Sequence, residues 1–393
     1  MIRAKAEVEG LTPYVAPLEG RRSLLRLDFN ESTVGPSPRV LDAIRSLPPD
    51  AYAAYPEYAG LNAAYAETIG VPERHVEAFN GVDAAIRAIF DAYGEKGSTL
   101  LTTAPTFGYY EPCAQQQGMV IDEIPYPPDL SFPLGAITGK LESRPRLLFV
   151  CNPNNPTGTL VEPSALVTLA RSAPQTLVVM DELYVAFTGR SVVPLALELA
   201  NVVTLQSLSK ASGLAALRLG FAIGHPTVLE RLRRVTGPYD INMFAVVAGK
   251  AALADPEHTR RYVAEVLAAR EWTIAELSRL GVRCAGEGGN YLLVWPPGGC
   301  EPAVQALREQ RILVRTWRRS RSSTAAFVSP SARSRTCAAS SAPSRRSRRF
   351  TRDRRGSESR RRGDSARVAR PRRPRAPRSE PSRSPTGRAR KSR

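Results

Sequence analysis

Short apolar runs that alternate with helical patterns are the feature that most limits how this chain can fold. Each run is five or six residues long, the length of a buried strand, and helical patterns such as Pro163–Arg171 separate the runs. Strands spaced by helices predict an α/β fold with a mostly parallel sheet covered by helices on both faces. Ligands bind such sheets beyond the carboxyl ends of the strands. The runs are Ser98–Thr102, Met119–Ile124, Arg146–Cys151, Thr176–Met180 and Val202–Ser207.

The 393 residues are enough for two domains with sizeable cores, and the sequence divides accordingly. The sequence indicates that residues 1–38 form an arm rich in proline and glycine and that residues 39–275 form a large domain. A long helical pattern at Pro256–Leu280 leads into a smaller domain, which starts with residues 276–315. The strands expected in that smaller domain are Tyr291–Trp295 and Ile312–Arg315.

The composition changes abruptly after Arg315. Residues 316–393 hold 26 basic and 4 acidic residues and lack Leu, Ile, Tyr, Met, Asn, Gln and His, whereas residues 1–315 hold 29 basic and 33 acidic residues. A segment so poor in apolar residues cannot bury a core, and we expect residues 316–393 to form a disordered tail. The excess of positive charge behind the net charge of +18 therefore lies entirely in the tail, while residues 1–315 are mildly acidic.

Three interpretations of this tail compete. An Arg/Ser/Pro-rich tail could bind nucleic acid through phosphates, and a fusion or cloning scar would also be foreign to the fold. We favour the third, a shifted reading frame in a GC-rich gene, and so expect no nucleic-acid partner. Codons chosen for Phe327–Arg333 permit Arg-Val-Ser-Val-Gly-Thr when read one register over. Resequencing the gene across the codons for Leu313–Thr324 tests this, and one intact long frame would contradict it.

The rest of the composition narrows the class of protein. There is no apolar run of membrane-spanning length and no secretory signal pattern at Met1–Leu25, so we expect a cytoplasmic protein without a membrane partner. Five cysteines are scattered without CxxC spacing, as expected for free thiols in a reducing compartment. The three histidines lie far apart in sequence and form no metal-site pattern.

Lys210 follows the apolar run at Val202–Ser207 and lies between two serines, with an arginine eight residues later. A lysine in a crowded, half-apolar pocket can lose its proton and attack an aldehyde. Hydroxyls and an arginine are the groups that anchor a phosphate ester. Together they predict pyridoxal phosphate held covalently by Lys210. The alternative is a lysine on a solvated loop.

Three further segments have ordinary explanations when taken singly. Asn152–Gly158 is a tight turn with two prolines, and Asp181 follows a buried strand, where it could simply cap a helix. Asn80–Asp83 is a glycine turn before the helical pattern Ala84–Tyr93, and such a turn offers free N–H groups to an anion. Their order along the chain, together with the Lys210 segment, favours one common site.

With these motifs, the sequence from about Leu11 to Arg315 resembles the fold-type-I pyridoxal-phosphate aminotransferases of class I/II, and among them the histidinol-phosphate group. The lysine, aspartate and asparagine motifs carry the likeness to the superfamily, while Tyr55–Glu57 and Ile312–Arg315 favour the narrower group. The resemblance implies a large domain around a mostly parallel, seven-stranded sheet and a smaller α/β C-terminal domain, here broken by the frame change. Other matching segments are Leu11–Tyr14, Leu27–Glu31, Gly81–Asp83 and Ala104–Gly108.

The resemblance also implies roles at the cofactor ring. Lys210 would bind the cofactor and then shuttle a proton between it and the substrate. Asp181 would pair with the pyridine nitrogen and keep it protonated. Asn155 and Tyr184 would hydrogen-bond the ring oxygen. Phe107 would stack on the ring, where many members of the family carry tyrosine.

The cofactor phosphate would lie in a cradle of donors. Tyr55 would reach this phosphate from a neighbouring subunit, so the resemblance implies a two-fold homodimer with shared sites. The cradle would consist of Ser207, Ser209, Arg218 and the N–H groups of Val82 and Asp83. The residues implied for substrate binding are Tyr14, Asn155 and Arg315.

For the reaction, the resemblance implies amino transfer between histidinol phosphate and 2-oxoglutarate in histidine biosynthesis, with Arg315 meeting the substrate phosphate. About thirteen residues later the family has a second arginine, in a pattern like Arg-Val-Ser-Val-Gly-Thr, which binds the α-carboxylate of glutamate and also takes part in phosphate recognition. The chain as written lacks that pattern. The alternatives are a related aminotransferase or decarboxylase for an aromatic or phosphorylated amino acid, and an inactive frameshifted product.

Overall fold

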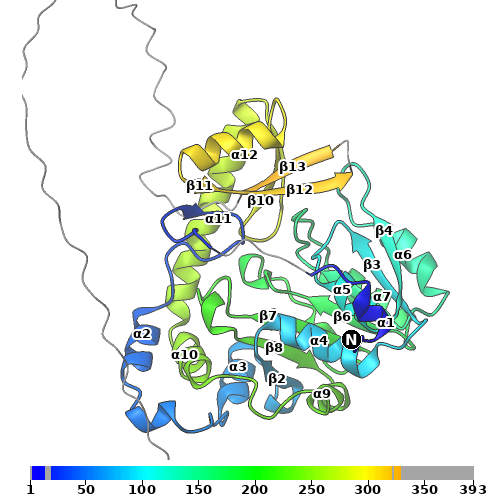
Figure 1. Cartoon of the computed structure of the whole chain (residues 1–393), viewed down its shortest axis with the longest axis vertical. Coiled ribbons are helices and arrows are strands. Elements are labelled where there is room, and N and C mark those ends of the chain that lie inside the picture. Colours follow the sequence, from blue (N-terminus) through cyan, green and yellow to red (C-terminus); the bar gives the residue numbers. More distant parts are fainter. Residues whose placement is uncertain (1, 14–18, 321–322, 329–393) are drawn as a thin grey trace, which may run out of the picture. The chain divides into compact units, whose positions relative to one another are not determined.

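The main sheet has seven strands in the order β2-β8-β7-β6-β5-β3-β4 (Figure 1). It is seen in a computed structural model that describes residues 2–13, 19–320 and 323–328. Strands β3 to β7 pair in parallel, whereas β8 runs antiparallel to both β7 and β2. The strands are β2 Val76–Phe79, β3 Thr99–Ala104, β4 Val120–Pro125, β5 Leu147–Cys151, β6 Leu177–Asp181, β7 Val202–Ser207 and β8 Gly220–Gly224.

The central strands are apolar on both faces because both faces are covered. Every residue of β5 and β6 is buried. Side chains alternate between the faces, so Leu147 and Phe149 join one core cluster while Leu148 and Val150 join another. This explains why these strands read as continuous apolar runs, and it confirms the predicted α/β fold with a mostly parallel sheet.

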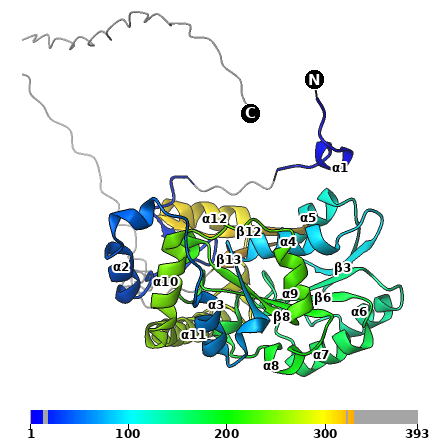
Figure 2. The same ribbon diagram turned by 90° about the horizontal axis from the view of Figure 1, so that it is seen from below.

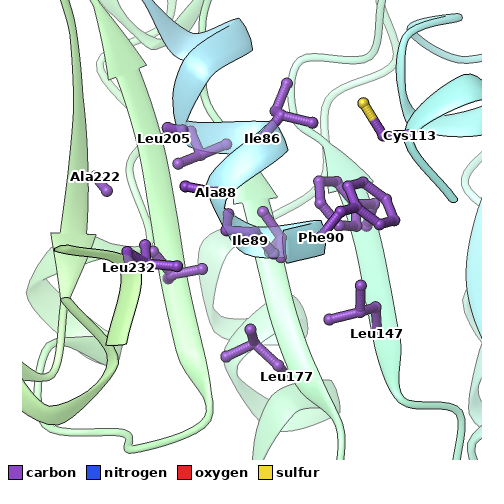
Figure 3. Close-up of a cluster of buried hydrophobic side chains, with 14 of the residues drawn as sticks. Ile86, Ala88, Ile89, Phe90, Cys113, Leu147, Leu177, Leu205, Ala222 and Leu232 are labelled. Atoms are coloured by element: carbon purple, nitrogen blue, oxygen red, sulfur yellow. The ribbon is translucent and has the colours of Figure 1, made fainter. Parts of the chain in front are cut away.

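Helices on each face complete the two clusters. On one face, Ile86, Ile89 and Phe90 of α4 pack over Leu147 and Leu177 of the sheet (Figure 3). Helices α5 and α9 also contribute to that cluster, and α6, α7 and α8 contribute to the other. The bounds are α4 Val82–Tyr93, α5 Tyr110–Gln116, α6 Leu134–Leu141, α7 Pro163–Ser172, α8 Val193–Ala196 and α9 Pro226–Arg233.

A third cluster lies where α10 packs on α2 and α3 (Figure 2). Among the residues that the structure describes, no helix is both long and apolar enough to cross a membrane. The remaining helices are α1 Ala6–Glu9, α2 Pro38–Arg45, α3 Leu61–Ile69, α10 Met243–Leu253, α11 Pro256–Arg279 and α12 Cys300–Glu309. Short 3-10 turns are η1 Pro49–Tyr52, η2 Glu73–His75, η3 Val185–Phe187 and η4 Ala215–Leu217.

Two smaller sheets contain the strands of the C-terminal part. One is antiparallel, with the order β12-β13-β10-β9, and the other pairs β1 with β11 in parallel. The β1–β11 pair matters for function because it ties the N-terminal arm to the segment just before Arg315. The strands are β1 Leu25–Arg26, β9 Arg283–Ala285, β10 Leu292–Trp295, β11 Ile312–Leu313, β12 Arg315–Ser320 and β13 Ser323–Val328.

The start of the expected tail differs from the prediction. Strands β12 and β13 extend past Arg315, and β13 pairs with β10 from Leu292↔Val328 to Val294↔Ala326. The expectation of disorder is therefore wrong for residues 316–320 and 323–328. Strand pairing uses main-chain groups, so a segment without large aliphatic residues can still extend a sheet whose other strands are apolar. Residues 329–393 lie outside the described residues.

The predicted domain boundary at residues 275 and 276 falls inside α11. Chain packing groups Met1–Ser341 into one compact unit, and the second unit, Ala342–Arg393, lies outside the described residues. The division of the body into a large and a small domain stays a prediction.

Candidate active site

The carboxyl ends of three adjacent strands carry the residues singled out in the sequence. Asp181 is the last residue of β6, Asn155 lies in the turn after β5, and Lys210 lies in the loop after β7. Because β5, β6 and β7 are parallel neighbours, these three ends share one edge of the sheet. Tyr184 lies beside two of them: its hydroxyl accepts a hydrogen bond from Asn155 Nδ2 at 3.4 Å, and Lys210 Nζ lies 5.9 Å from its ring centroid.

Lys210 is partly buried, and its amine has a specific partner. Nζ donates a hydrogen bond of 2.8 Å to the carbonyl oxygen of Phe29, in the N-terminal arm. Burial lowers the pKa of Lys210 to about 8, and the positive charge of Arg218 acts in the same direction. The carboxylates of Glu31, Asp83 and Asp181 oppose this shift. A lysine with these surroundings is not the solvated-loop lysine of the alternative interpretation, and its neutral amine is accessible near neutral pH.

Asp181 is 2 % exposed, and both of its carboxylate oxygens are held. Tyr110 Oη donates to Oδ2 at 2.6 Å, and the N–H of Leu183 donates to Oδ1 at 3.1 Å. Burial raises the pKa of Asp181 to about 6, while the hydrogen bonds from Tyr110 and Leu183 oppose the rise. The next helical turn, η3, is capped by Tyr184 and receives no side-chain bond, so the helix-cap explanation of Asp181 does not hold. Tyr110 was not predicted as part of the site.

A cradle of donors lies at the N-terminus of α4. Gly81 precedes this helix with φ +75°, and a Cβ atom there would lie 2.6 Å from Nη2 of Arg218. Arg218 Nη2 pairs with Asp83 Oδ2 at 2.9 Å, and Ser207 Oγ bonds Ser209 Oγ at 2.9 Å. Glycine suits this position because its backbone has a φ of +75°, a conformation that residues with a Cβ atom rarely adopt. Helix N–H groups, hydroxyls and a guanidinium form a donor set that fits a phosphate.

The arm residues Phe29 and Asn30 belong to the site, although sequence reasoning gave them no role. Phe29 supplies the carbonyl that holds Lys210, and Asn30 Nδ2 donates to Tyr184 Oη at 2.9 Å. Arg315 lies near the same two arm residues, with its guanidinium 5.9 Å from the Phe29 ring centroid. The likeness of Leu27–Glu31 to the family was the one signal that pointed here.

The remaining predicted residues have different surroundings. Phe107 packs edge-on against Tyr110, with ring centroids 5.6 Å apart, and thus neighbours the partner of Asp181. Tyr55 is 71 % exposed and stacks on Tyr239 with centroids 4.1 Å apart. None of the contacts found for Tyr55 within the described residues is with Lys210, Asp181 or the α4 cradle. Tyr14 lies outside the described residues.

Residues 22–346 match the family Aminotransferase class I and II. The chain belongs to this family. A relative named histidinol-phosphate aminotransferase, from Aromatoleum aromaticum, is 35 % identical over 330 residues, covering 80 % of this chain and 91 % of the relative. Another of nearly the same name, from Trichormus variabilis, is 32 % identical over 316 residues, covering 79 % and 89 % of the two chains. The expectation of a pyridoxal-phosphate-dependent aminotransferase acting on amino and 2-oxo acids is therefore confirmed.

Solved structures support the same fold for this class I and II aminotransferase. Histidinol-phosphate aminotransferase from Sinorhizobium meliloti, in complex with pyridoxal 5'-phosphate, has a TM-score of 0.75 at 23 % identity, covering 84 % of this chain and 93 % of its own. Aspartate aminotransferase from Thermus thermophilus with maleate has a TM-score of 0.71 at 22 % identity, with coverages of 84 % and 95 %. Proteins of two different names share this fold at similar identity, so the fold alone does not select the substrate.

Proposed function

We propose that this aminotransferase moves an amino group between histidinol phosphate and 2-oxoglutarate; the relatives above are named for amino transfer with the first of these substrates. The observation that carries the proposal is the convergence of Lys210, Asp181 and Asn155 beside an anion cradle, with Arg315 at the same turn of the arm. The cradle accounts for the cofactor phosphate, and Arg315 supplies a separate cation for the phosphate of a substrate. The visible absorbance spectrum of the purified chain, recorded before and after adding histidinol phosphate, tests the substrate.

Each residue has a physical task in this proposal. Pyridoxal phosphate, when bound, supplies a ring that takes up the electrons left at the substrate α carbon. The charge of Asp181 holds a proton at the ring nitrogen, and the hydrogen bonds from Tyr110 and Leu183 keep that carboxylate ionised and oriented. Lys210 moves the proton at the α carbon, because its lowered pKa lets it act as both base and acid near neutral pH.

The orientation of the ring has its own set of residues. Tyr184 and Asn155 hold the ring oxygen, and Phe107 covers one ring face. Arg218, Ser207, Ser209 and the first N–H groups of α4 bind the phosphate, which fixes the ring relative to Lys210. In this proposal the ion pair of Arg218 with Asp83 is exchanged in part for the phosphate, because a guanidinium can serve both anions.

The lowered pKa of Lys210 gives a pH prediction. Only the neutral amine attacks the cofactor aldehyde, so covalent uptake of pyridoxal phosphate by the cofactor-free chain should rise with pH. With the pKa lowered from 10.5 to about 8, the rate should climb about tenfold per unit below pH 8 and level off above it. Stopped-flow absorbance between pH 6 and 10.5 measures this. A rate that keeps climbing steeply from pH 9 to 10.5, as for an ordinary lysine, would contradict the lowered pKa.

We also propose a two-fold homodimer. Tyr55 and Tyr239, 71 % and 57 % exposed, present a stacked aromatic pair to solvent, and large exposed aromatic residues are typical of interfaces. In the dimer Tyr55 reaches the phosphate cradle of the other subunit. Sedimentation of the purified chain tests the dimer, and a monomer at all concentrations would refute it.

The cytoplasmic location also stays a proposal. It is supported by the four cysteines of the described residues, Cys113, Cys151, Cys284 and Cys300, which are free thiols. Cell fractionation would check it, and recovery of the chain outside the cytoplasm would overturn it.

A further inference from the structure

Asn30 occupies a position where the backbone itself is constrained. Its φ is +56°, in the left-handed region that asparagine tolerates better than most residues. The side chain is 2 % exposed, and the residue makes contacts in two directions. Its carbonyl oxygen accepts from Asn290 Nδ2 at 3.1 Å, and its own Nδ2 donates to Tyr184 Oη at 2.9 Å. The preceding carbonyl, of Phe29, holds Lys210. One turn of the arm therefore touches two residues of the cofactor site.

The hydrogen-bond inventory of Tyr184 explains why this contact matters. A phenol has one proton to donate and can accept through its oxygen. In the described residues the oxygen accepts from two amides, Asn30 Nδ2 at 2.9 Å and Asn155 Nδ2 at 3.4 Å. With the oxygen acting as acceptor, the proton of Tyr184 is left for another acceptor. Burial raises the pKa of Tyr184 well above its ordinary value, so the hydroxyl keeps that proton at any working pH.

We propose that Asn30 is a positioning residue that turns the hydroxyl proton of Tyr184 toward the ring oxygen of the cofactor. This inference rests on the ring-oxygen role proposed above for Tyr184. By donating to the phenol oxygen, Asn30 excludes the orientation in which Tyr184 would give its proton to the arm. The cofactor oxygen then receives a hydrogen bond whose direction is set before it binds, which is the advantage of a preorganised site. Among the residues that the structure describes, the buried Oδ1 of Asn30 has no hydrogen-bond partner, so it too is available to a bound molecule.

This orientation has a measurable consequence. The ring oxygen of the cofactor shares the proton of the Lys210–cofactor linkage. A hydrogen bond donated to this oxygen withdraws electron density from it and weakens its hold on that proton. It therefore lowers the pH at which that linkage loses its proton. The visible absorbance of the cofactor-loaded chain, followed against pH without substrate, reports this value directly. The charged and titratable groups that face Tyr184 and stay constant across the variants are Cys151, Asp181, Lys210, Tyr291 and Arg315.

The test is a pair of substitutions and their combination. Asn30→Gly removes the amide and keeps the left-handed backbone without strain, and Tyr184→Phe removes the hydroxyl. Asn30→Gly should raise the pKa of the linkage by about half a unit to one unit, the equivalent of one hydrogen bond. In the Tyr184→Phe background the same change should have no effect, because Asn30 acts through the hydroxyl. The melting temperature of the cofactor-free chain is recorded in parallel.

Three outcomes overturn the inference. A lower pKa in Asn30→Gly would mean that Asn30 accepts the tyrosine proton and competes with the cofactor for it. An unchanged pKa together with a lower melting temperature would mean that Asn30 only holds the arm in place. An unchanged pKa in Tyr184→Phe itself would remove the proposed role of Tyr184 as well, so the two failures are distinguishable. If Asn30→Gly does not fold, Asn30→Asp replaces it. Asn30→Asp should raise the pKa by more in the parent chain than in the Tyr184→Phe background, and equal shifts would refute the inference.

Discussion

Replacing Lys210 by alanine should abolish covalent attachment of pyridoxal phosphate and lower the rate of amino transfer by at least about 10⁴-fold, because in the proposed mechanism this one side chain serves as both attachment point and proton carrier. The visible band of the loaded enzyme should disappear. After borohydride treatment, mass spectrometry should find no pyridoxyl group on the chain. The protein itself should stay folded, since removing a buried amine removes its desolvation cost along with its one hydrogen bond to Phe29.

Lys140→Ala is the matched control for this experiment. Lys140 is an exposed lysine on α6 that pairs with Asp122 at 2.8 Å, away from the residues of the site. The control should keep both the visible band and the rate. A Lys210→Ala chain that still gave a yellow, borohydride-fixed adduct would show that another lysine holds the cofactor.

The second large effect is expected at Asp181. Asp181→Ala should leave pyridoxal phosphate weakly bound and remove nearly all turnover. Asp181→Asn should lower the rate of turnover by about 10³-fold, although it keeps the shape of the side chain. The amide oxygen can still accept from the N–H of Leu183, and the amide NH2 group can donate to Tyr110 Oη because a phenol oxygen also accepts, so the loss would come mainly from the missing charge opposite the ring nitrogen. Steady-state kinetics and equilibrium dialysis with pyridoxal phosphate separate the two effects.

The neighbouring Glu182 provides a control of the same chemistry. It is also a fully buried carboxyl, and burial raises its pKa to about 7. Its oxygens accept from Ser191 Oγ, the N–H of Val192 and Gln206 Nε2, and its contacts do not include Tyr110. Glu182→Gln should therefore change stability and leave the rate within about threefold of the parent. Turnover by Asp181→Asn at the parent rate would remove Asp181 from its proposed role.

Much of the large sheet could be predicted because its strands are buried on both faces and read as uninterrupted apolar runs. The five predicted runs match β3 to β7 within two residues at each end, and the predicted helices Pro163–Arg171 and Pro256–Leu280 match α7 and α11 as closely. Strands β2 and β8 were missed because β2 has four residues and β8, Gly220–Gly224, begins and ends with glycine. Nothing local marks such segments as strands, and only their antiparallel pairing in the sheet reveals them.

The residues of the candidate site likewise divide into those that could be predicted from the sequence and those that could not. Lys210, Asp181 and Asn155 could be placed together because each follows a predicted strand of one parallel sheet. Asn30 could not, because it lies 154 residues from Tyr184 in the chain, in an arm whose strand β1 pairs with the distant β11. Tyr110 was missed for a similar reason, since its contact with Asp181 spans 71 residues between α5 and β6.

The change after Arg315 leaves one question about the complete reaction. The sequence lacks the second arginine that the resemblance implies for the glutamate carboxylate, and the position thirteen residues beyond Arg315 is Val328, the last residue of β13. A backbone that reaches this position in a strand does not restore a guanidinium. We therefore expect the half-reaction with glutamate to be weaker than the half-reaction with histidinol phosphate.

The most direct test of the account is the visible absorbance spectrum of the purified chain, recorded alone, after glutamate, and after histidinol phosphate. We expect a cofactor band at the outset and its conversion to the pyridoxamine form on adding histidinol phosphate, as the first half of amino transfer. A cofactor band that histidinol phosphate leaves unchanged would contradict the proposed substrate and point to a substrate site lost with the frame after Arg315. Absence of any cofactor band would contradict the assignment of Lys210 itself.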